Sequence, residues 1–559
     1  MKYPRRIFGC LLFSLLTVLP LRAAVWNVTS AADANVLGTL RFAVNNSVAN
    51  DRIKFDPALA GQTISLTLGE LPITKNLTIT GLGPTNLAIV NDLDRVFHVF
   101  NGPLNAGISG LKLTGHRKGA RGTDGTVVFV DGTDGAGATG GCIQNDALCT
   151  LAVSNCFFAG GQAIGGDGGN AYTNDNYHSV ANGGRGGAAC GGAVFSNGDV
   201  LLMNCAFAGN FAGSGGGGYG SYGGNGGHGG TAHGGALCDV YGNTTIFLVN
   251  CTFYGNTASA GDGGNAGNAW LLAPGAANGG NGGIGGQAAG GAIFVDQGCP
   301  DDSCTGIVHC TIDGNQVAPG EGKKGGQGVN GGVIGANGAN GTARGGGIYA
   351  PNAGRLPIGN TIVAANFATF HFTTGSLVFT GPDVFNDVSS FHYNFIGALD
   401  LTSSGWMPGF DFTGTVTAPL DPLLGPLQNN GGETLTQAPG PCSPVVDKGS
   451  ATLFNHDQIL QPRPVGITPS PYFADGSDIG AHELQSFPTN APLLGISYAT
   501  NLTTISWPAA FSCFALLQNT NLASTNWFSV ANAVTLVGGQ CQVVLAPTLH
   551  HQFFRLVHP

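Results

Sequence analysis

Short apolar runs bracketed by glycine and asparagine recur along the middle of this chain. The stretch GGAVFSNGDVLLMNCAFAGN, residues 191–210, returns as GGALCDVYGNTTIFLVNCTFYGN at 234–256 and as GGAIFVDQGCPDDSCTGIVHCTIDGN at 290–315. Weaker copies cover 140–161 and 345–368. Each copy is long enough for two or three short strands separated by turns. This repetition predicts an architecture in which every copy forms one structural unit.

Cysteine and asparagine occupy fixed positions in the copies, which predicts how the units stack. In four of the five units one cysteine directly follows Asn155, Asn204, Asn250 or His309, giving the set Cys156, Cys205, Cys251 and Cys310. A second asparagine follows a glycine in three units, at Asn210, Asn256 and Asn315. An antiparallel sandwich would not place identical residues in register. The pattern therefore predicts an all-β, right-handed parallel β-helix in which each unit forms a coil above the previous one.

The stacked cysteines and asparagines have structural roles in this prediction. We expect the cysteines to form a buried ladder of small apolar fillers. A zinc site is the alternative, but a linear stack with a spacing of about 4.8 Å cannot surround one tetrahedral ion. The asparagines are expected at bends, where their amides bond to the coils above and below.

The hydrophobic pattern divides the chain into five parts. Residues 1–23 are predicted to be a signal peptide, because Lys2, Arg5 and Arg6 precede the apolar run IFGCLLFSLLTVLPL and the small residues of LRAA. An uncleaved membrane anchor is the alternative, although the run is short for a span of about 20 residues. No later segment is apolar enough to cross a bilayer, which predicts a chain without a transmembrane span once the signal is removed.

The other four parts all belong to the predicted β structure. Residues 24–118 are expected to form an N-terminal cap and the first coils, with a helical piece in GTLRFAVNNSVAN. Residues 119–368 hold the repeats and their loops, and 369–486 hold irregular coils and a closing segment. Residues 487–559 contain short strands spaced like those of a small β-sandwich.

Long glycine tracts separate the repeats, and glycine supplies 96 of the 559 residues. All the tracts leave the coil after the Gly-Asn bend, so they should emerge in a row from one side. One interpretation is flexible loops, because glycine is costly to order. The other starts from triplets such as NGGNGGIGG and predicts extended three-fold segments that pack side by side.

Charge and composition exclude some partners. The formal net charge is −10 and charged residues make up only 9% of the chain, so no basic patch for nucleic acid is expected. An enzyme acting on polysaccharides would need carboxylates, lysines or arginines at its site. Few of these residues lie in the repeats. DGTDGAG at 131–137 and GGDGGN at 165–170 have the composition of calcium loops without their period. We therefore expect no catalytic residue and no cofactor, with calcium bound by these loops as the alternative.

The densest polar cluster lies near the end of the fourth part, residues 369–486, and two further pairs of cysteines lie outside the ladder. We expect the cluster to form a network that closes the helix end, with Arg463 pairing a carboxylate. Catalysis by the cluster is the alternative. Its main members are Asp457, Arg463, Asp478 and Glu483, with Asp475 and His482 nearby. Cys299 and Cys304 flank a turn and can close a local disulfide, and Cys513 and Cys541 can pair within the last domain.

Three segments of the chain resemble bacterial choice-of-anchor Q proteins. They are GTLRFAVNNSVANDRIKFDPALAGQTISL, the GGAIFV…HCTIDGN repeats, and DPLLGPLQNNGGETLTQAPGPCSPVVDKGS followed by DQILQPRPV and DGSDIGAHE. The resemblance covers roughly residues 25–486. It implies a secreted or surface protein with a pectin-lyase-like β-helix and with repeats similar to those of polymorphic outer-membrane proteins. It implies no catalytic residues.

These observations together lead to an expected function. We expect an exported, non-catalytic β-helix, extracellular, on the cell surface or periplasmic, whose glycine-rich loops form a lateral surface for adhesion, matrix contact or self-association. Extracellular polysaccharides, surface proteins or further copies of the chain are the partners to consider. The alternative function is a polysaccharide lyase or glycoside hydrolase that acts along a groove of the helix. Binding of carbohydrate by the C-terminal sandwich is a third interpretation.

Overall fold

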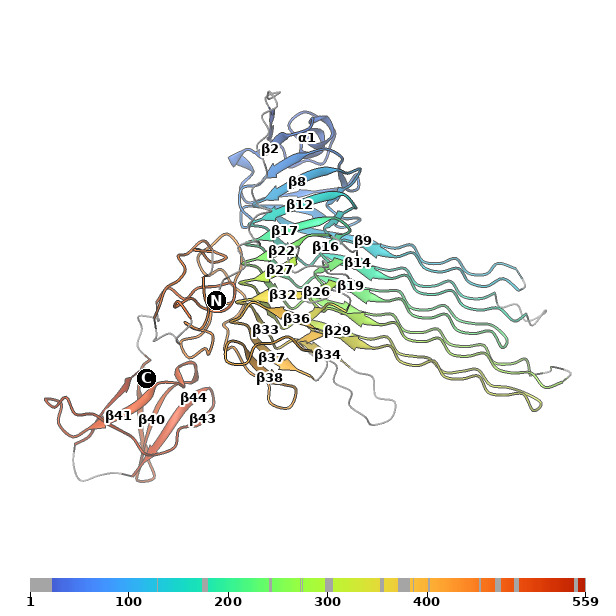
Figure 1. Cartoon of the computed structure of the whole chain (residues 1–559). Helices are drawn as coiled ribbons and strands as arrows, with labels where there is room; N and C mark the ends of the chain where they lie inside the picture. The colour runs from blue at the N-terminus through green and yellow to red at the C-terminus, as the bar shows by residue number, and fades with distance from the viewer. Residues whose placement is uncertain are drawn as a thin grey trace.

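The computed structural model shows a column of stacked coils with a row of long arms on one side (Figure 1). It describes residues 23–127, 129–172, 179–240, 244–271, 273, 275–296, 305–351, 356–369, 383–385, 387–400, 403–451, 454–467, 474–486, 492–546 and 551–557. The coil strands pair in parallel and in register with the strands of the next coil. The predicted all-β class and parallel β-helix are therefore confirmed. The predicted signal peptide and the Cys299–Cys304 pair lie outside the described residues.

Three walls of parallel strands make up the column. A fourth, five-stranded sheet, here called the arm-root column, supports the arms. The ten-stranded wall contains β1 (Val25–Val28), β2 (Asp51–Phe55), β5 (Leu77–Thr80), β8 (Leu104–Ser109), β12 (Cys149–Ser154), β17 (Asp199–Met203), β22 (Ile246–Val249), β27 (Thr305–Val308), β32 (Leu356–Gly359) and β36 (Val388–Ser390). The eight-stranded wall contains β4 (Leu71–Ile73), β7 (Phe97–Val99), β11 (Ile143–Asn145), β16 (Val194–Ser196), β21 (Leu237–Asp239), β26 (Ile293–Val295), β31 (Ile348–Tyr349) and β35 (Val384–Phe385).

The fifteen-stranded wall bends where each coil has two strands in it. Its strands are β3 (Gln62–Ser65), β6 (Leu87–Asn91), β9 (Lys112–Lys118), β13 (Phe157–Ala159), β14 (Gln162–Ile164), β18 (Ala206–Ala208), β19 (Phe211–Gly213), β23 (Thr252–Tyr254), β24 (Thr257–Ser259), β28 (Thr311–Asp313), β29 (Gln316–Ala318), β33 (Ile362–Ala364), β34 (Phe367–Ala368), β37 (Phe395–Leu399) and β38 (Phe412–Thr415). The arm-root column contains β10 (Ala138–Thr139), β15 (Ala189–Cys190), β20 (Ala232–His233), β25 (Ala288–Ala289) and β30 (Ala343–Arg344).

A short helix covers the amino-terminal end of the column, as the sequence predicts. Helix α1 (Leu40–Asn46) begins at Thr39, whose hydroxyl accepts a hydrogen bond from the Phe42 N–H. It packs against β1, β2 and β4 and buries Leu40 and Val44. A 3₁₀ turn, η1 (Pro57–Leu59), follows β2. The apolar face of α1 thus shields the first coil from pairing with another strand.

Identical side chains pile up inside the column because successive coils are in register. Phe158, Phe207 and Phe253 stack with their ring centroids 4.5 Å apart at each step. Cys156, Cys205, Cys251 and Cys310 each precede in-register strand residues and are completely buried. The residues before these cysteines all have positive φ, between 49° and 54°. Asparagine tolerates this left-handed conformation, which explains its recurrence there.

The asparagines after the glycines form a continuous hydrogen-bonded ladder. The Asn256 side-chain oxygen accepts the Asn210 backbone N–H at 3.0 Å and its side-chain N–H at 2.8 Å. The Asn315 side-chain oxygen accepts the same two hydrogen bonds from Asn256. The ladder then continues through Asn366 to Asp383, which the repeats did not reveal. Burial raises the pKa of Asp383 to about 7, although hydrogen bonds from Asn366 oppose this shift.

The segment after the last coils lies along the side of the column rather than across its end (Figure 1). The Thr434 hydroxyl donates to the Asn204 carbonyl, and the Asn250 side chain donates to the His456 carbonyl. Further along the column, toward its C-terminal end, the Gly480 N–H donates to the Asn360 carbonyl. These contacts span four coils, so the prediction that this segment closes the helix end is wrong. The segment binds the corner of the column through polar backbone groups that the repeat pattern does not display.

The C-terminal domain is the predicted small β-sandwich. One sheet has β39 (Gly495–Ala499), β40 (Leu502–Pro508), β43 (Thr535–Val537) and β44 (Gln540–Leu545), and the other has β41 (Ala515–Asn519), β42 (Phe528–Ser529) and β45 (Phe553–Val557). The turn η2 (Ala509–Phe511) leads to Cys513. The prediction of a Cys513–Cys541 disulfide is wrong, because Cys513 bonds to Cys442 of the lateral segment. Cys541 instead points into the sandwich core and is a free thiol.

Replacing Asn256 with alanine tests the asparagine ladder. The change removes both acceptor contacts to Asn210 and both donor contacts, to Asn315 and to the Phe207 carbonyl. We expect the free energy of unfolding to fall by about 1–3 kcal/mol for each buried group left unpaired, measured by urea denaturation. Asn45→Ala, at an exposed position of α1, is the matched control and should change it by less than about 0.5 kcal/mol. Equal effects of the two changes would contradict the ladder.

Candidate functional site

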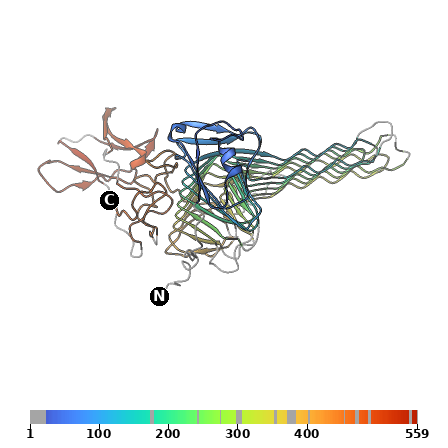
Figure 2. The same ribbon diagram turned by 90° about the horizontal axis from the view of Figure 1, so that it is seen from above.

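The arms form one ordered array, and the flexible-loop interpretation does not describe them. The arm array comprises the described residues of 119–137, 165–188, 214–231, 260–287 and 319–342, and each arm has an outgoing and a returning segment (Figure 1). Seen along the column, the arms project as a narrow slab away from the C-terminal domain (Figure 2). The first arm was not recognised from the sequence because it lacks paired glycines. Its signal was the three-residue spacing of Gly119, Gly122 and Gly125.

Hydrogen bonds at every third residue join each outgoing segment to the next. The Gly119, Gly122 and Gly125 N–H groups donate to the carbonyls of Ile164, Asp167 and Asn170 at 2.7–2.8 Å. The returning segments repeat the pattern, for example from Gly183 to Asn225 and from Gly186 to His228. A period of three residues is that of an extended three-fold helix, which has no hydrogen bonds within itself. The backbone groups of the arms are therefore satisfied by neighbouring arms.

A second set of bonds links the outgoing layer to the returning layer. The Gly184 N–H donates to the Gly169 carbonyl, and the Gly218 N–H donates to the Gly184 carbonyl, at 2.9 and 2.8 Å. The Gly227 N–H in turn donates to Gly218. Each segment therefore packs against other segments on two sides, namely the next arm and the other layer. This packing requires the backbones to be in direct contact.

Along the arm shafts glycine is required for space and not for an unusual backbone conformation, whereas Gly223 and Gly331, at turns of two arms, have positive φ. A Cβ on Gly218 would lie 1.9 Å from the Gly169 carbonyl oxygen, and one on Gly227 would lie 1.8 Å from that of Gly184. Neither glycine has a positive φ. Gly216, two residues before Gly218, faces outward, and a Cβ there would meet nothing closer than 3.6 Å. Two of every three positions must therefore be small, and the third is open to other residues.

Asparagine and aspartate at the third position complete the hydrogen bonding at the surface of the array. The side-chain oxygens of Asp167 and Asp262 accept the backbone N–H groups of Gly216 and Glu321 in the next arm, each at 2.8 Å. In the returning layer, the Asn225 side-chain oxygen accepts a hydrogen bond from the Asn281 backbone N–H at 2.8 Å. Asp131 and Asp134, of the suspected calcium loop, likewise accept the backbone N–H groups of Asn182 and Arg185 in the next arm. Their carboxylates therefore have a structural use without calcium.

The last arm is closed by its own side chains. The Gly322 and Gly325 N–H groups face away from the array, where the described residues contain no sixth arm. The side-chain oxygens of Asn340 and Asn337 accept them at 2.9 and 3.1 Å. This satisfies an edge that would otherwise offer its donors to another chain.

Apolar side chains are exposed around the far end of the array, here called the arm tips. Leu271 is 80% exposed, Phe129 70% and Val333 69%. Val127, Val180 and Ile334 are also more than half exposed. The glycine-rich shafts between the tips and the column carry mostly polar third-position residues. The tips thus combine exposure and apolar character, as contact surfaces often do.

One ionic cluster lies on the outward face of the eight-stranded wall, among the early coils. The His98 ring nitrogens contact Glu70 at 3.0 Å and Asp146 at 3.1 Å, and Arg95 contacts Glu70 at 3.4 Å. Burial opposes the charged form of His98, but hydrogen bonds to Glu70 and Asp146 raise its pKa. The sequence analysis missed this cluster because its members come from separate, weakly repeated coils. Carboxylates and cations gather on the outward face here, so the enzymatic alternative is judged at this cluster.

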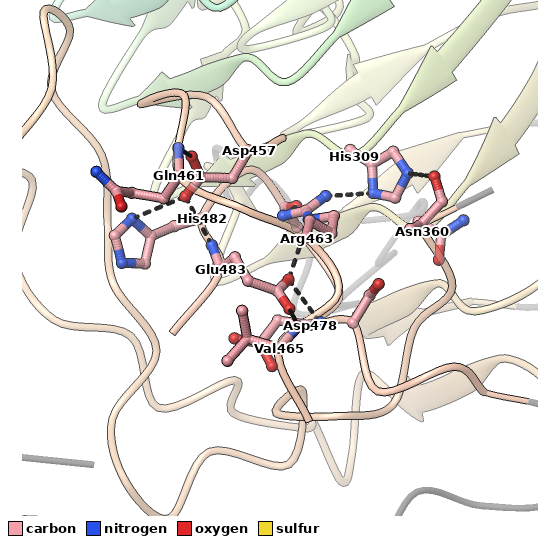
Figure 3. A network of polar contacts seen from close by, with 12 residues as sticks. His309, Asn360, Asp457, Gln461, Arg463, Val465, Asp478, His482 and Glu483 are labelled. Atoms are coloured by element: carbon pink, nitrogen blue, oxygen red, sulfur yellow. Dashed lines mark hydrogen bonds and ion pairs between the residues drawn. The ribbon is translucent and has the colours of Figure 1, made fainter. Parts of the chain in front are cut away.

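The polar network predicted around Arg463 is present on the side of the column (Figure 3). Arg463 and Glu483 are fully buried and form an ion pair at 3.0 Å. Glu483 also accepts N–H groups from Val465 and Asp478, at 2.7 and 2.9 Å. Asp457 accepts the Glu483 N–H, and Asp478 accepts the Leu484 N–H. All four predicted members therefore meet, and their carboxylates are used to hold turns of the lateral segment.

The network also reaches into the column through His309. Arg463 contacts the His309 ring Nδ1, and the other ring nitrogen lies 3.3 Å from the Ala451 carbonyl oxygen. Burial and the neighbouring Arg463 hold the pKa of His309 well below its usual value. His309 thus replaces the asparagine of the other coils at the point where the lateral segment docks. Since the whole network is buried, it has the properties of a structural clamp.

Comparisons with known proteins leave the family of this chain open. No family model matches the sequence, and no curated protein matches it. Across the described residues, no helix is both long and apolar enough to cross a membrane. The same residues contain no group of three or more histidine, cysteine or acidic side chains arranged to hold a metal ion.

Alanine substitutions two residues apart in one arm test the packing of the array. Gly218→Ala should place its methyl group against the Gly169 backbone, while the methyl group of Gly216→Ala makes only ordinary contacts, none closer than 3.6 Å. We expect Gly218→Ala to lower the free energy of unfolding by about 1–3 kcal/mol or more. Gly216→Ala should be neutral or stabilise by up to about 1 kcal/mol. Indistinguishable urea denaturation curves for the two variants would show that the arms do not pack as described.

The pH dependence of stability tests the burial of His309. The folded state keeps His309 neutral because its pKa is lowered, whereas the unfolded chain protonates it near pH 6.5. Stability is therefore lost as pH falls below 6.5, by up to about 1.4 kcal/mol per pH unit. His309→Asn provides the residue used in the other coils and does not titrate. The difference in unfolding free energy, wild type minus His309→Asn, should decrease as the pH is lowered from 7.5 to 5. A difference that does not change with pH would contradict this account.

Proposed function

We propose that this chain is an exported, non-catalytic adhesion scaffold whose arm tips contact another surface. The observation that carries the proposal is the ordered array itself. Five arms, bonded to one another at every third residue, hold exposed apolar side chains away from the column. With about nine to fourteen residues per segment at about 3.1 Å each, the tips stand roughly 28–43 Å from the column.

The proposal follows from how the arms are built. Ordering glycine costs more conformational entropy than ordering any other residue. The chain offsets this cost with backbone hydrogen bonds on two sides and with side-chain acceptors on the outer faces. A flexible tether would need none of these contacts. A rigid array suits a contact surface, because little entropy remains to be lost on binding.

Adhesion by the tips can be measured with a triple variant and a matched control. The tip variant carries Phe129→Ser, Leu271→Ser and Val333→Ser, and the control carries Leu37→Ser, Leu93→Ser and Leu148→Ser at equally exposed sites of the column. The mature protein is bound to sensors coated with alkane chains or with acidic or neutral polysaccharides. We expect the tip variant to lose at least tenfold in affinity on a surface that binds wild type. Equal loss in both variants, or no binding of wild type to any surface, would contradict the proposal.

The ionic cluster at His98 supports a second candidate function. Glu70 and Asp146 flank a histidine whose pKa is raised, as an acid–base pair acting on a polysaccharide would require. Both carboxylates are nevertheless held in ion pairs. Incubation of the protein with acidic and neutral polysaccharides, followed by assay of reducing ends and unsaturated products, decides between the two functions. Turnover that is lost in His98→Gln would replace the adhesion proposal with an enzymatic one.

A further inference from the structure

Side-chain pairs fasten the roots of the arms to the eight-stranded wall. The second residue of each strand in the arm-root column lies in register with its neighbours, in the order Thr139, Cys190, His233, Ala289, Arg344. The middle residues of the wall strands are in register too, in the order Gln144, Phe195, Cys238, Phe294, Tyr349, Phe385. The two rows face each other at the base of the arm array.

Most levels of the two rows are joined by a non-covalent contact. The Thr139 hydroxyl donates to the Gln144 side-chain oxygen at 2.8 Å. The His233 ring stacks on Phe294 with centroids 4.2 Å apart and an interplanar angle of 5°. The Arg344 guanidinium lies 5.0 Å from the centre of the Phe385 ring. Each contact connects an arm root to the wall of the same coil or of the next one.

At the level of the second arm the two facing residues are both cysteines. Cys190, at the root of this arm, packs in an apolar cluster with Cys238 of the next coil. Both thiols are free in this structure. The Cys190 Sγ also lies 4.0 Å from the His233 Nδ1. Two thiols packed in one cluster, with a base beside one of them, form a site for disulfide chemistry.

We propose that Cys190 and Cys238 are oxidised to a disulfide that fastens the second arm covalently to the next coil. The Cys190 thiolate attacks one sulfur of a small-molecule disulfide. A mixed disulfide forms on Cys190, and the other half of the small molecule leaves as the first thiolate. Cys238, after giving up its proton, attacks the Cys190 sulfur and expels the second small thiolate. The two protons released by the cysteines end on the two small thiols. The protein pair is oxidised by two electrons and the small disulfide is reduced by two.

The surroundings of Cys190 favour this reaction over reaction at the other buried thiols. Hydrogen bonds with Cys238 and His233 lower the pKa of Cys190 to about 6, against the effect of burial. Burial raises the pKa of the ladder thiols Cys156, Cys205 and Cys251 well above the ordinary value. Cys190 is also only partly buried, whereas the ladder thiols are inaccessible. Attack should therefore begin at Cys190.

The experiment uses the full mature protein incubated with glutathione disulfide. The oxidised protein is denatured, its free thiols are blocked with a maleimide, and chymotryptic peptides are identified by mass spectrometry. We expect a cross-linked peptide pair containing Cys190 and Cys238 that disappears on reduction, and no maleimide on either residue. The Cys442–Cys513 pair serves as the internal standard for a disulfide.

Single variants separate the proposed link from simple protection of buried thiols. In Cys190→Ser the released Cys238 should carry maleimide, whereas in Cys149→Ser, a change at another buried free cysteine, both residues should stay linked. Maleimide on both cysteines of the oxidised wild-type protein would overturn the proposal. So would Cys190 recovered only as its glutathione adduct, or linked to a different cysteine. The wild-type result stands even if a variant fails to fold.

Discussion

Each inner segment of the column and of the arm array is held by the equivalent segment of the coil or arm above and of the one below. The register is strict across β12, β17, β22 and β27, and it continues into the arms, where the spacing of the bonds changes from that of strands to every third residue. Because equivalent residues lie over one another, one suitable side chain can be used repeatedly. The phenylalanine stack, the cysteine ladder, the asparagine ladder and the third-position residues of the arms all depend on this constraint.

The same constraint explains how glycine-rich segments can be ordered at all. A tract of glycine alone has no side chains to bury and a large entropy to lose. Here direct contact between backbones replaces a side-chain core, and Asn or Asp completes the bonding at the outer faces. The arm roots are tied to the wall by specific pairs such as His233 with Phe294. Rigidity therefore passes from the column into the arms.

Residues that repeat could be predicted, and contacts between unlike segments could not. Asn210, Asn256 and Asn315 were predictable because they share one position in adjacent copies, but Asp383 continues their ladder without a repeat around it. The Cys442–Cys513 link joins two regions that have no common period, so spacing suggested the nearer Cys541 instead. The lateral segment docks on backbone groups such as the Asn204 carbonyl, which no sequence pattern displays. The three-residue period of the arms was visible, but hydrogen bonding between arms depends on their relative register.

The most direct test of this account is amide hydrogen exchange in the arms, resolved to single residues. The N–H groups of Gly184, Gly218 and Gly227 are bonded between layers, so their exchange should be slowed strongly, as in the strands of the column. The N–H of Gly275, for which the described structure shows no backbone partner, provides an internal comparison and should exchange faster. Exchange of the three interior glycines at the rate of an unstructured chain would contradict the account.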